Sequence, residues 1–161
     1  MDDHAPQTMG ASREQQALAV LRVALGAMFV WVFFENLGKG LYTPAGYKGL
    51  IDYYVKNGHA PGIWKGVMSV VAANASVVAP LQAVTELGLG VLLVGGAATR
   101  LAAAVAGAYL FSLWISELGT SWVWELGIPV IVAFSLAWAR PGRTWGLDAL
   151  LARRRPGWRL G

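Results

Sequence analysis

Four glutamates stand inside or at the ends of the apolar stretches of this 161-residue sequence: Glu35, Glu86, Glu117 and Glu125. Lys39 follows Glu35 by four residues, the spacing of a helical ion pair. An acid near the middle of a bilayer costs roughly 2.5–3.5 kcal/mol on insertion scales, so it marks a candidate functional site. A desolvated carboxyl group can exchange protons with a bound ligand. We therefore predict that Glu86 is a catalytic acid and that all five residues line one ligand pocket.

The segments that must position these residues are long and apolar. Hydrophobic residues make up 56% of the chain and charged residues only 14%, against about 25% in an ordinary soluble domain. The charges gather in the tails and in one loop, as the hydrocarbon core of a bilayer requires. One domain is expected at this length, so residues 1–161 are predicted to form a single integral membrane domain.

The predicted fold is all-α, an integral membrane bundle of four helices, because a crossing helix needs about 20 apolar residues. The crossings are predicted at residues 17–37, 80–99, 101–118 and 122–139. The second crossing is placed by counting back from Arg100 to Pro80, since proline suits the first turn of a helix. Residues 38–79 then form an outer loop with a short surface helix at 63–78, and residues 140–161 form a basic tail.

The basic residues set the predicted orientation. Nine arginines fall on the side of the termini and four lysines on the other, which predicts cytoplasmic termini in a bacterial-type inner membrane. Arg22 lies one turn inside the first apolar segment, and its side chain is expected to reach back to the inner interface. Five other arginines are predicted to anchor the chain to lipid headgroups: Arg100, Arg143, Arg153, Arg154 and Arg155. Membrane lipids, and not nucleic acid, are the expected partners of this charge.

The sequence excludes several kinds of redox centre. It contains no cysteine, which excludes disulfides, thiolate metal sites and iron–sulfur clusters. Its two histidines, His4 and His59, lie outside the apolar stretches, so a bis-histidine haem within the bundle is excluded as well. We therefore expect no metal and no covalently attached cofactor in this chain.

The predicted topology places the glutamates in the outer half of the bundle. Glu86 is the deepest, about 9 Å below the outer end of its helix at 1.5 Å per residue. In one interpretation, the acids and Lys39 line an outward-facing pocket for a quinone headgroup, whose reduction consumes protons. In the other, Glu35, Glu117 and Glu125 are solvated at the interface. In both, Glu86 needs a polar partner, such as Lys39, a second acid or a bound headgroup.

Three blocks of the sequence resemble the DoxX/DoxD membrane proteins. They are residues 21–26 (LRVALG) with 34–39 (FENLGK), residues 86–93 (ELGLGVLL) with 96–103 (GAATRLAA), and residues 142–148 (GRTWGLD). In the first block, Glu35 and Asn36 stand where many members have His-Gly. The blocks follow one another in the family's order and span nearly the whole chain.

This resemblance implies a four-helix membrane fold and a role in redox chemistry. The relatives with the best-defined activity are small subunits of thiosulfate:quinone oxidoreductase, which work with a second subunit. The resemblance thus implies a membrane subunit of a quinone-linked oxidoreductase, with quinone as its ligand and another subunit or a second copy as its partner. The acidic, histidine-bearing segment of the DoxD branch is replaced here by residues 117–122 (ELGTSW), so thiosulfate itself is not implied as the substrate.

Two further functions remain open. One is a non-catalytic scaffold that anchors partner proteins in the membrane. The other is a small proton-coupled transporter that uses Glu86 as its coupling site. Quinone or lipid-tail density beside Glu86 would favour the redox subunit, whereas an inverted repeat, of which the sequence has no convincing example, would favour the transporter.

Overall fold

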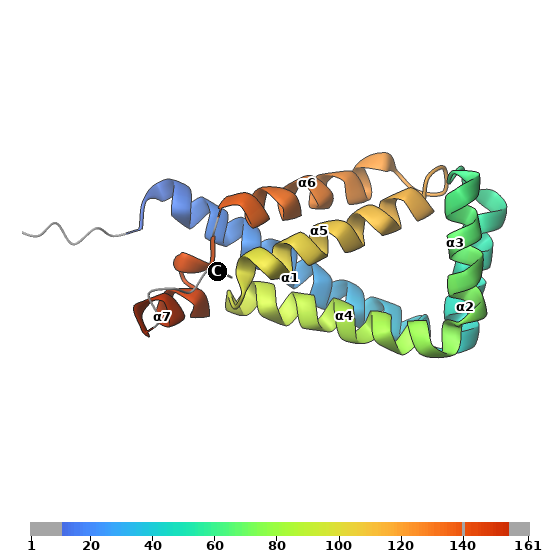
Figure 1. Cartoon of the computed structure of the whole chain (residues 1–161), viewed down its shortest axis with the longest axis horizontal. Coiled ribbons are helices and arrows are strands. Elements are labelled where there is room, and N and C mark those ends of the chain that lie inside the picture. Colours follow the sequence, from blue (N-terminus) through green and yellow to red (C-terminus); the bar gives the residue numbers. More distant parts are fainter. Residues whose placement is uncertain (1–10, 140, 155–161) are drawn as a thin grey trace, which may run out of the picture.

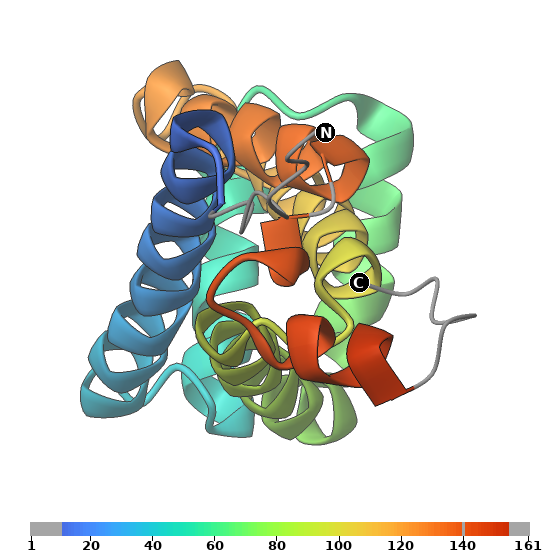
Figure 2. The same ribbon diagram turned by 90° about the vertical axis from the view of Figure 1, so that its left-hand side faces the viewer.

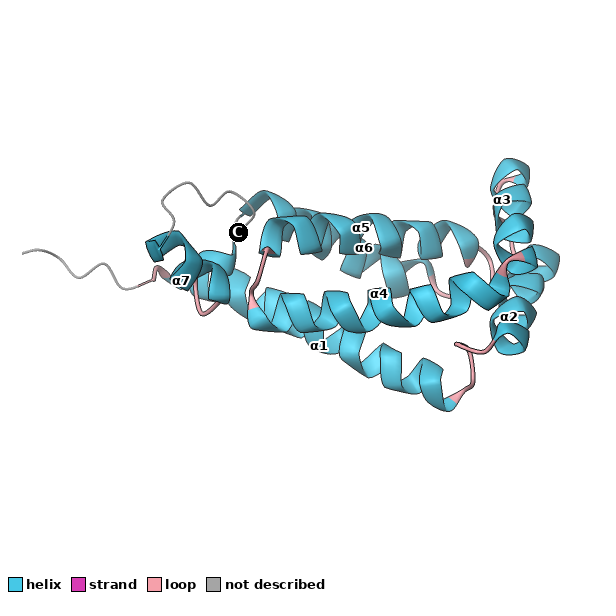
Figure 3. Cartoon of the chain, turned by 60° about the horizontal axis from the view of Figure 1, so that its bottom comes forward, coloured by secondary structure: helices cyan, strands magenta, loops and turns pink. Residues whose placement is uncertain are grey.

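The computed structural model describes residues 11–139 and 141–154, apart from the side chains of Arg143 and Arg153. The helices in this part of the chain are α1 (Arg13–Gly38), α2 (Pro44–Asn57), α3 (Gly62–Ala73), α4 (Ala75–Gly95), α5 (Thr99–Ser116), α6 (Val123–Ala139), the 3-10 helix η1 (Pro141–Arg143) and α7 (Leu147–Arg154). Helices α1, α4, α5 and α6 run along the long axis of the molecule (Figures 1 and 3). Helices α2 and α3 lie across one end, the α2–α3 end, and α7 lies at the other, the α7 end.

The bundle consists of two closely packed helix pairs, α1 with α4 and α5 with α6. Gly26 and Gly90 mark the closest approach of α1 to α4. A Cβ atom built on Gly26 would lie 2.7 Å from the amide nitrogen of Val94 and 2.9 Å from the carbonyl oxygen of Gly90. In the other pair, the ring of Phe134 covers Gly107. Glycines allow such close packing, which drives helix association in lipid.

Both the core and the outer surface of the bundle are apolar. Leu25, Phe29, Leu93 and Leu136 are buried in the centre, while outward side chains such as Val84 are left exposed. Helices α1, α4 and α5 are long and apolar enough to cross a membrane, and α6 is a shorter apolar helix of 17 residues. The chain is therefore a membrane protein, and the predicted all-α membrane bundle is confirmed.

The α2–α3 end contains a helix that was not predicted from the sequence. Residues 44–57, predicted as loop, form α2. The hydroxyl of Thr43 caps this helix by accepting a hydrogen bond from the amide of Gly46 at 3.1 Å. The inner face of α2, with Tyr47 and Ile51, packs against α3 and the start of α4 in a second apolar core. This core holds the α2–α3 layer against the end of the bundle.

The predicted boundary at Pro80 is wrong, because the chain turns six residues earlier, at Asn74. Helix α3 ends just before Asn74 and α4 begins just after it. The backbone N–H and the side-chain amide of Asn74 both donate to the carbonyl of Val70, at 3.2 and 2.8 Å. A single residue thus sets the direction of α3 across the bundle. Pro80 is tolerated inside α4, where it costs one backbone hydrogen bond.

The predicted end of the same crossing also shifts. Helix α4 ends at Gly95, before the predicted Thr99, because Gly96 adopts a left-handed conformation with a φ of 65°. This conformation is the usual helix terminator and favours glycine. The other crossings overlap α1, α5 and α6 with ends that differ by four residues or fewer.

Arg22 is buried at the α7 end, and the expectation that it reaches back to the lipid interface is wrong. Its side chain is 0% exposed. Its Nη1 donates to the carbonyls of Pro141 and Thr144 at 3.1 and 3.2 Å, and its Nη2 donates to that of Trp145 at 2.9 Å. These carbonyls belong to the η1–α7 connection, which folds over this end of the bundle (Figure 2). The guanidinium satisfies them where water cannot.

Asp148 completes this buried cluster. Its carboxylate accepts the backbone N–H groups of Ala98 and Thr99 at 2.9 and 2.8 Å. It therefore caps the first turn of α5 from α7, since α5 has no capping side chain of its own. Asp148 also attracts the guanidinium of Arg22. Together these contacts fasten α7 to the bundle.

Candidate functional site

Glu86 faces the interior of the bundle. It shares one face of α4 with Ala79, Leu89 and Leu93, all of which are buried. This spacing places the four side chains on the stripe of α4 that packs inward. As a result, the side chain of Glu86 is only 1% exposed. A buried carboxylate is stable only if hydrogen-bond donors replace its water.

Four side chains supply these donors. Oε1 of Glu86 accepts from Nε2 of Gln82 at 3.0 Å and from the hydroxyl of Tyr109. Oε2 accepts from Nδ2 of Asn36 at 3.1 Å and from the hydroxyl of Tyr42. A carboxylate offers about four acceptor positions, so these four donors saturate the ionised form. The predicted partner Lys39 is not among them.

The donors tie separate parts of the chain to one carboxylate. Asn36 comes from α1, Gln82 from α4 and Tyr109 from α5, while Tyr42 comes from the connection between α1 and α2. The ring of Tyr42 stacks on Phe33, with 5.4 Å between the ring centroids. Burial and the hydrogen bond to Glu86 raise the pKa of Tyr42, so its hydroxyl stays protonated and able to donate.

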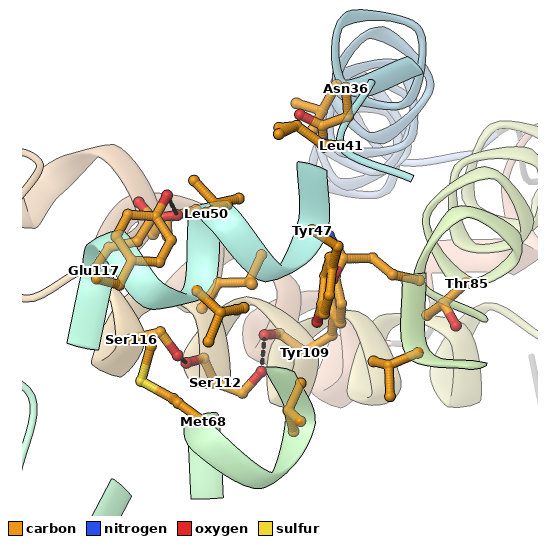
Figure 4. Close-up of a pocket in the computed structure, with 18 of the residues that line it drawn as sticks. Asn36, Leu41, Tyr47, Leu50, Met68, Thr85, Tyr109, Ser112, Ser116 and Glu117 are labelled. Atoms are coloured by element: carbon orange, nitrogen blue, oxygen red, sulfur yellow. Dashed lines mark hydrogen bonds between the residues drawn. The ribbon is translucent and has the colours of Figure 1, made fainter. Parts of the chain in front are cut away.

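A cavity of about 790 Å³ lies between the bundle and the α2–α3 layer (Figure 4). Drug-sized ligands occupy pockets of roughly 300–1,000 Å³. Asn36, Gln82 and Tyr109 form part of the cavity wall, whereas Glu86 does not. Three of the four donors to Glu86 therefore stand between its carboxylate and the cavity.

Another part of the cavity wall is apolar. It includes Val67, Met68 and Val71 of α3 and Val78 and Leu81 of α4. Val67 is 45% exposed and Leu81 is 60% exposed, so this wall continues onto the apolar outer surface of the molecule. A ligand with a polar head and an apolar tail would find both kinds of surface here.

A second carboxyl group stands on the wall, at Glu117, the first residue after α5. It accepts hydrogen bonds from the hydroxyls of Tyr54 and Ser121, both at 3.0 Å. Burial raises the pKa of Glu117, and the nearby charge of Glu125 adds to this effect, although the two hydrogen bonds oppose it. Figure 4 shows Glu117 at one side of the cavity and Tyr109 toward the other.

The structure brings four of the five predicted pocket residues onto the cavity wall: Glu35, Lys39, Glu117 and Glu125. The predicted ion pair between Lys39 and Glu35 is confirmed, with 2.6 Å between Nζ and Oε1. Both side chains are about half exposed, so this pair lies at the rim. Glu86 is separated from the cavity by the side chains that donate to it. The role of all five residues in binding a ligand stays a prediction.

The predicted anchoring arginines occupy different positions. The Nε of Arg100 donates to the carbonyl of Ala137 at 3.2 Å, which links α5 to α6. Arg154 is exposed on α7. The side chains of Arg143 and Arg153 and the whole of Arg155 lie outside the described residues. Lipid anchoring by these arginines stays a prediction.

Sequence reasoning missed the four donors to Glu86. Gln82 carried a usable signal, because it precedes Glu86 by four residues and shares its helix face. Tyr109 and Asn36 carried a weaker one, as polar groups within apolar segments. Tyr42 carried none, since only the path of the α1–α2 connection brings it to Glu86.

Comparison with known proteins covers most of the cavity wall, but not Glu117, Ser121, Glu125 and Leu126. The DoxX family model matches residues 17–116, a range that includes Glu86 and its four donors. No curated protein and no solved structure matches the sequence. Among the described residues, no three His, Asp or Glu side chains gather in a way that could hold a metal ion.

Proposed function

The chain belongs to the DoxX family, and on that premise we propose that it is the quinone-binding membrane subunit of an oxidoreductase complex. The cavity beside Glu86 is the observation that carries this proposal. Its apolar wall continues onto the outer surface of the bundle, which suits a lipid-soluble ring and tail. Its polar wall includes the amides of Asn36 and Gln82, each with a second N–H that suits a carbonyl oxygen, and Tyr109, whose hydroxyl donates to Glu86.

The residues around Glu86 are suited to handle protons. A quinone takes up two electrons and two protons when it becomes a quinol. Tyr109 reaches the cavity and is hydrogen-bonded to Glu86. After Glu86 has taken up a proton from the water side, Tyr109 can give its own proton toward the cavity and recover the one on Glu86, and a second round supplies the second proton of the quinol. The carboxylate that remains is the form that the four donors stabilise. Quinol oxidation would run the same transfer in reverse.

The electrons must come from a redox centre on a partner, because this chain has no cysteine and no histidine in its apolar segments. This redox partner is a second protein subunit; a further copy of this chain is an alternative partner in the membrane but would not supply the electrons. With cytoplasmic termini, as the arginine bias favours, the cavity opens toward the outer side of the membrane. The basic residues near the termini then meet anionic lipids on the inner side.

A binding measurement on the purified full chain tests this proposal. The probe is decyl-ubiquinone, whose short tail allows it to be added from solution. Trp64 lines the cavity, so its fluorescence should be quenched as the quinone binds. The Trp64→Phe variant identifies the part of the signal that comes from this residue. Decanol in place of the quinone controls for binding driven by the tail alone.

Ser112→Leu is the matched variant, because Ser112 lines the cavity and leucine would fill part of it. We expect saturable quenching in the wild type and at least tenfold weaker binding in Ser112→Leu, about 1.4 kcal/mol. Equal binding of decanol and quinone, or equal quinone affinity of the wild type and Ser112→Leu, would contradict a quinone site in this cavity. The scaffold function would then become the better account.

A further inference from the structure

Two tyrosine–glutamate pairs stand on opposite sides of the cavity. Tyr109 donates to Glu86 at the deep side, and Tyr54 donates to Glu117 at 3.0 Å on the other. Tyr109 and Glu117 are eight residues apart along the same stretch of chain, about 12 Å at 1.5 Å per residue. Unlike Glu86, Glu117 is itself part of the wall. The second pair thus repeats the chemistry of the first in a more accessible place.

The position of Glu117 connects the cavity to water. It follows the last turn of α5 at the α2–α3 end and is half-buried. Ser121 and Glu125, its neighbours on the wall, belong to the turn and the first turn of α6, and Glu125 is exposed. One side of this carboxyl therefore meets the cavity while the neighbouring surface is open to solvent.

Polar groups continue from Glu117 toward Tyr109. Ser116 and Ser112 line the cavity between them. Their hydroxyls donate to carbonyls of α5, at 2.8 and 2.7 Å, so their oxygen lone pairs are available to accept. Ser116 already accepts from Nε1 of Trp64 at 2.9 Å. A wall of this kind can hold water molecules, which need two to four polar partners.

We propose that Glu117 is the group through which the cavity exchanges protons with water, and that Tyr54 positions its carboxylate. Glu117 takes one proton from the water side, becomes neutral, and returns to the carboxylate when it gives that proton to the cavity. The proton then replaces the one that Tyr109 and Glu86 have delivered. The inference rests on the proposed function, because the quinone headgroup is what consumes these protons.

The groups around Glu117 define how its titration should respond. Glu125 on α6 disfavours its ionised form, while the hydroxyls of Tyr54 on α2 and Ser121 favour it. His59 packs on Gly119 in the turn after α5. Lys65 on α3 donates to the carbonyl of Gly58 at 2.8 Å. Removing Glu125 should therefore lower the titration midpoint, and removing the hydroxyl of Tyr54 should raise it.

Infrared spectroscopy of the purified full chain, in a detergent without ester groups, tests the proposal. The measured signal is the carbonyl stretch of protonated carboxyl groups as the pH is changed. We expect a component with a raised midpoint that Glu117→Gln removes. Glu125→Gln should shift this component to lower pH and Tyr54→Phe to higher pH. Glu35→Gln is the matched control, because Glu35 is also on the rim but is paired with Lys39, and it should leave the component unchanged.

A purely structural tie between α2 and the end of α5 predicts a different pattern. Tyr54→Phe would then lower thermal stability, and no titrating component would depend on Glu117. That result would overturn the proposal. Decyl-ubiquinone binding, measured on the same samples, separates the two claims. Quinone binding is read from the wild type and the titrating component from the comparison of the wild type with Glu117→Gln, so each claim has its own measurement. If Glu117 titrates but the protein does not bind quinone, the quinone site is contradicted and the exchange site stands. If the protein binds quinone but no component depends on Glu117, the exchange site is contradicted and the quinone site stands.

Discussion

The two ends of the bundle each bury one charged side chain, but they satisfy it in different ways. Arg22 at the α7 end is 0% exposed and Glu86 toward the α2–α3 end is 1% exposed. Arg22 donates to three backbone carbonyls of one short connection. Glu86 accepts from four side chains that come from separate segments. The first arrangement fixes a backbone path, and the second gathers groups that can exchange protons.

The two ends also differ in how much open space lies beside the buried charge. Around Arg22 the chain is packed so closely that a Cβ atom on Gly146 would lie 2.7 Å from Nη1 of Arg22. Beside Glu86, the donors border a cavity of about 790 Å³. Burial of a charge therefore does not by itself indicate function. A buried charge marks a candidate for chemistry when its partners are exchangeable side chains and a ligand has room to approach them.

The largest expected effect is the replacement of Arg22. Arg22→Met leaves three carbonyls without a donor and Asp148 without its nearby positive charge. Removing one partner of a buried charge cluster costs about 3–5 kcal/mol. Thermal unfolding of the purified protein should show this loss. Arg100→Met is the control, because Arg100 is half-buried and donates to one carbonyl, that of Ala137. Equal stability of the two variants would contradict a structural role for the α7-end cluster.

A larger side chain at each end of the bundle tests whether the α7 end is closely packed and the cavity is open. At Gly146, a Cβ would also lie 2.6 Å from the carbonyl oxygen of Gly142, so Gly146→Ala should cost about 1–3 kcal/mol. Ser112→Leu adds more atoms but places them in the cavity, and it should cost less than about 1 kcal/mol. Thermal unfolding of the two variants measures both. If Ser112→Leu were the less stable protein, the cavity would not be open in solution.

Glu86→Gln is expected to have only a small effect on stability. Glutamine keeps the shape of the side chain, and the amides of Asn36 and Gln82 can rotate to offer their oxygens instead of their nitrogens. The loss should be about 1 kcal/mol. The change removes titration, so quinone-linked turnover of the parent complex should be abolished. Normal turnover in a folded Glu86→Gln complex would assign Glu86 a structural role like that of Arg22.

The apolar segments predict the bundle because bilayer thickness and helical rise fix how many residues must cross. The same argument cannot find α2, whose polar residues and short length give no crossing signal, although its helix is held by Thr43 and by contacts with α3 and α4. The turn at Asn74 is not predicted either. Pro80 was the stronger sequence signal for a helix start, but it lies inside α4, where it is tolerated.

The candidate site, too, could be predicted only in part. The cost of a buried acid predicts that Glu86 turns inward and needs polar partners. It does not predict which partners, because Tyr42 and Tyr109 reach Glu86 only through the tertiary packing of α1, α4 and α5. Likewise, Arg22 meets carbonyls more than 100 residues away in the sequence. Backbone groups of that kind carry no residue signature, so snorkelling to lipid was the only expectation the sequence supported.

The most direct test of the account is an experimental structure of the full chain prepared with decyl-ubiquinone. Planar headgroup density should appear in the cavity between Trp64 and Tyr109. One carbonyl oxygen should lie within hydrogen-bond reach of the Tyr109 hydroxyl, and the tail should follow the apolar wall past Val67 and Leu81. Headgroup density elsewhere on the protein, or a cavity that holds only a lipid tail with Tyr109 turned away, would contradict it.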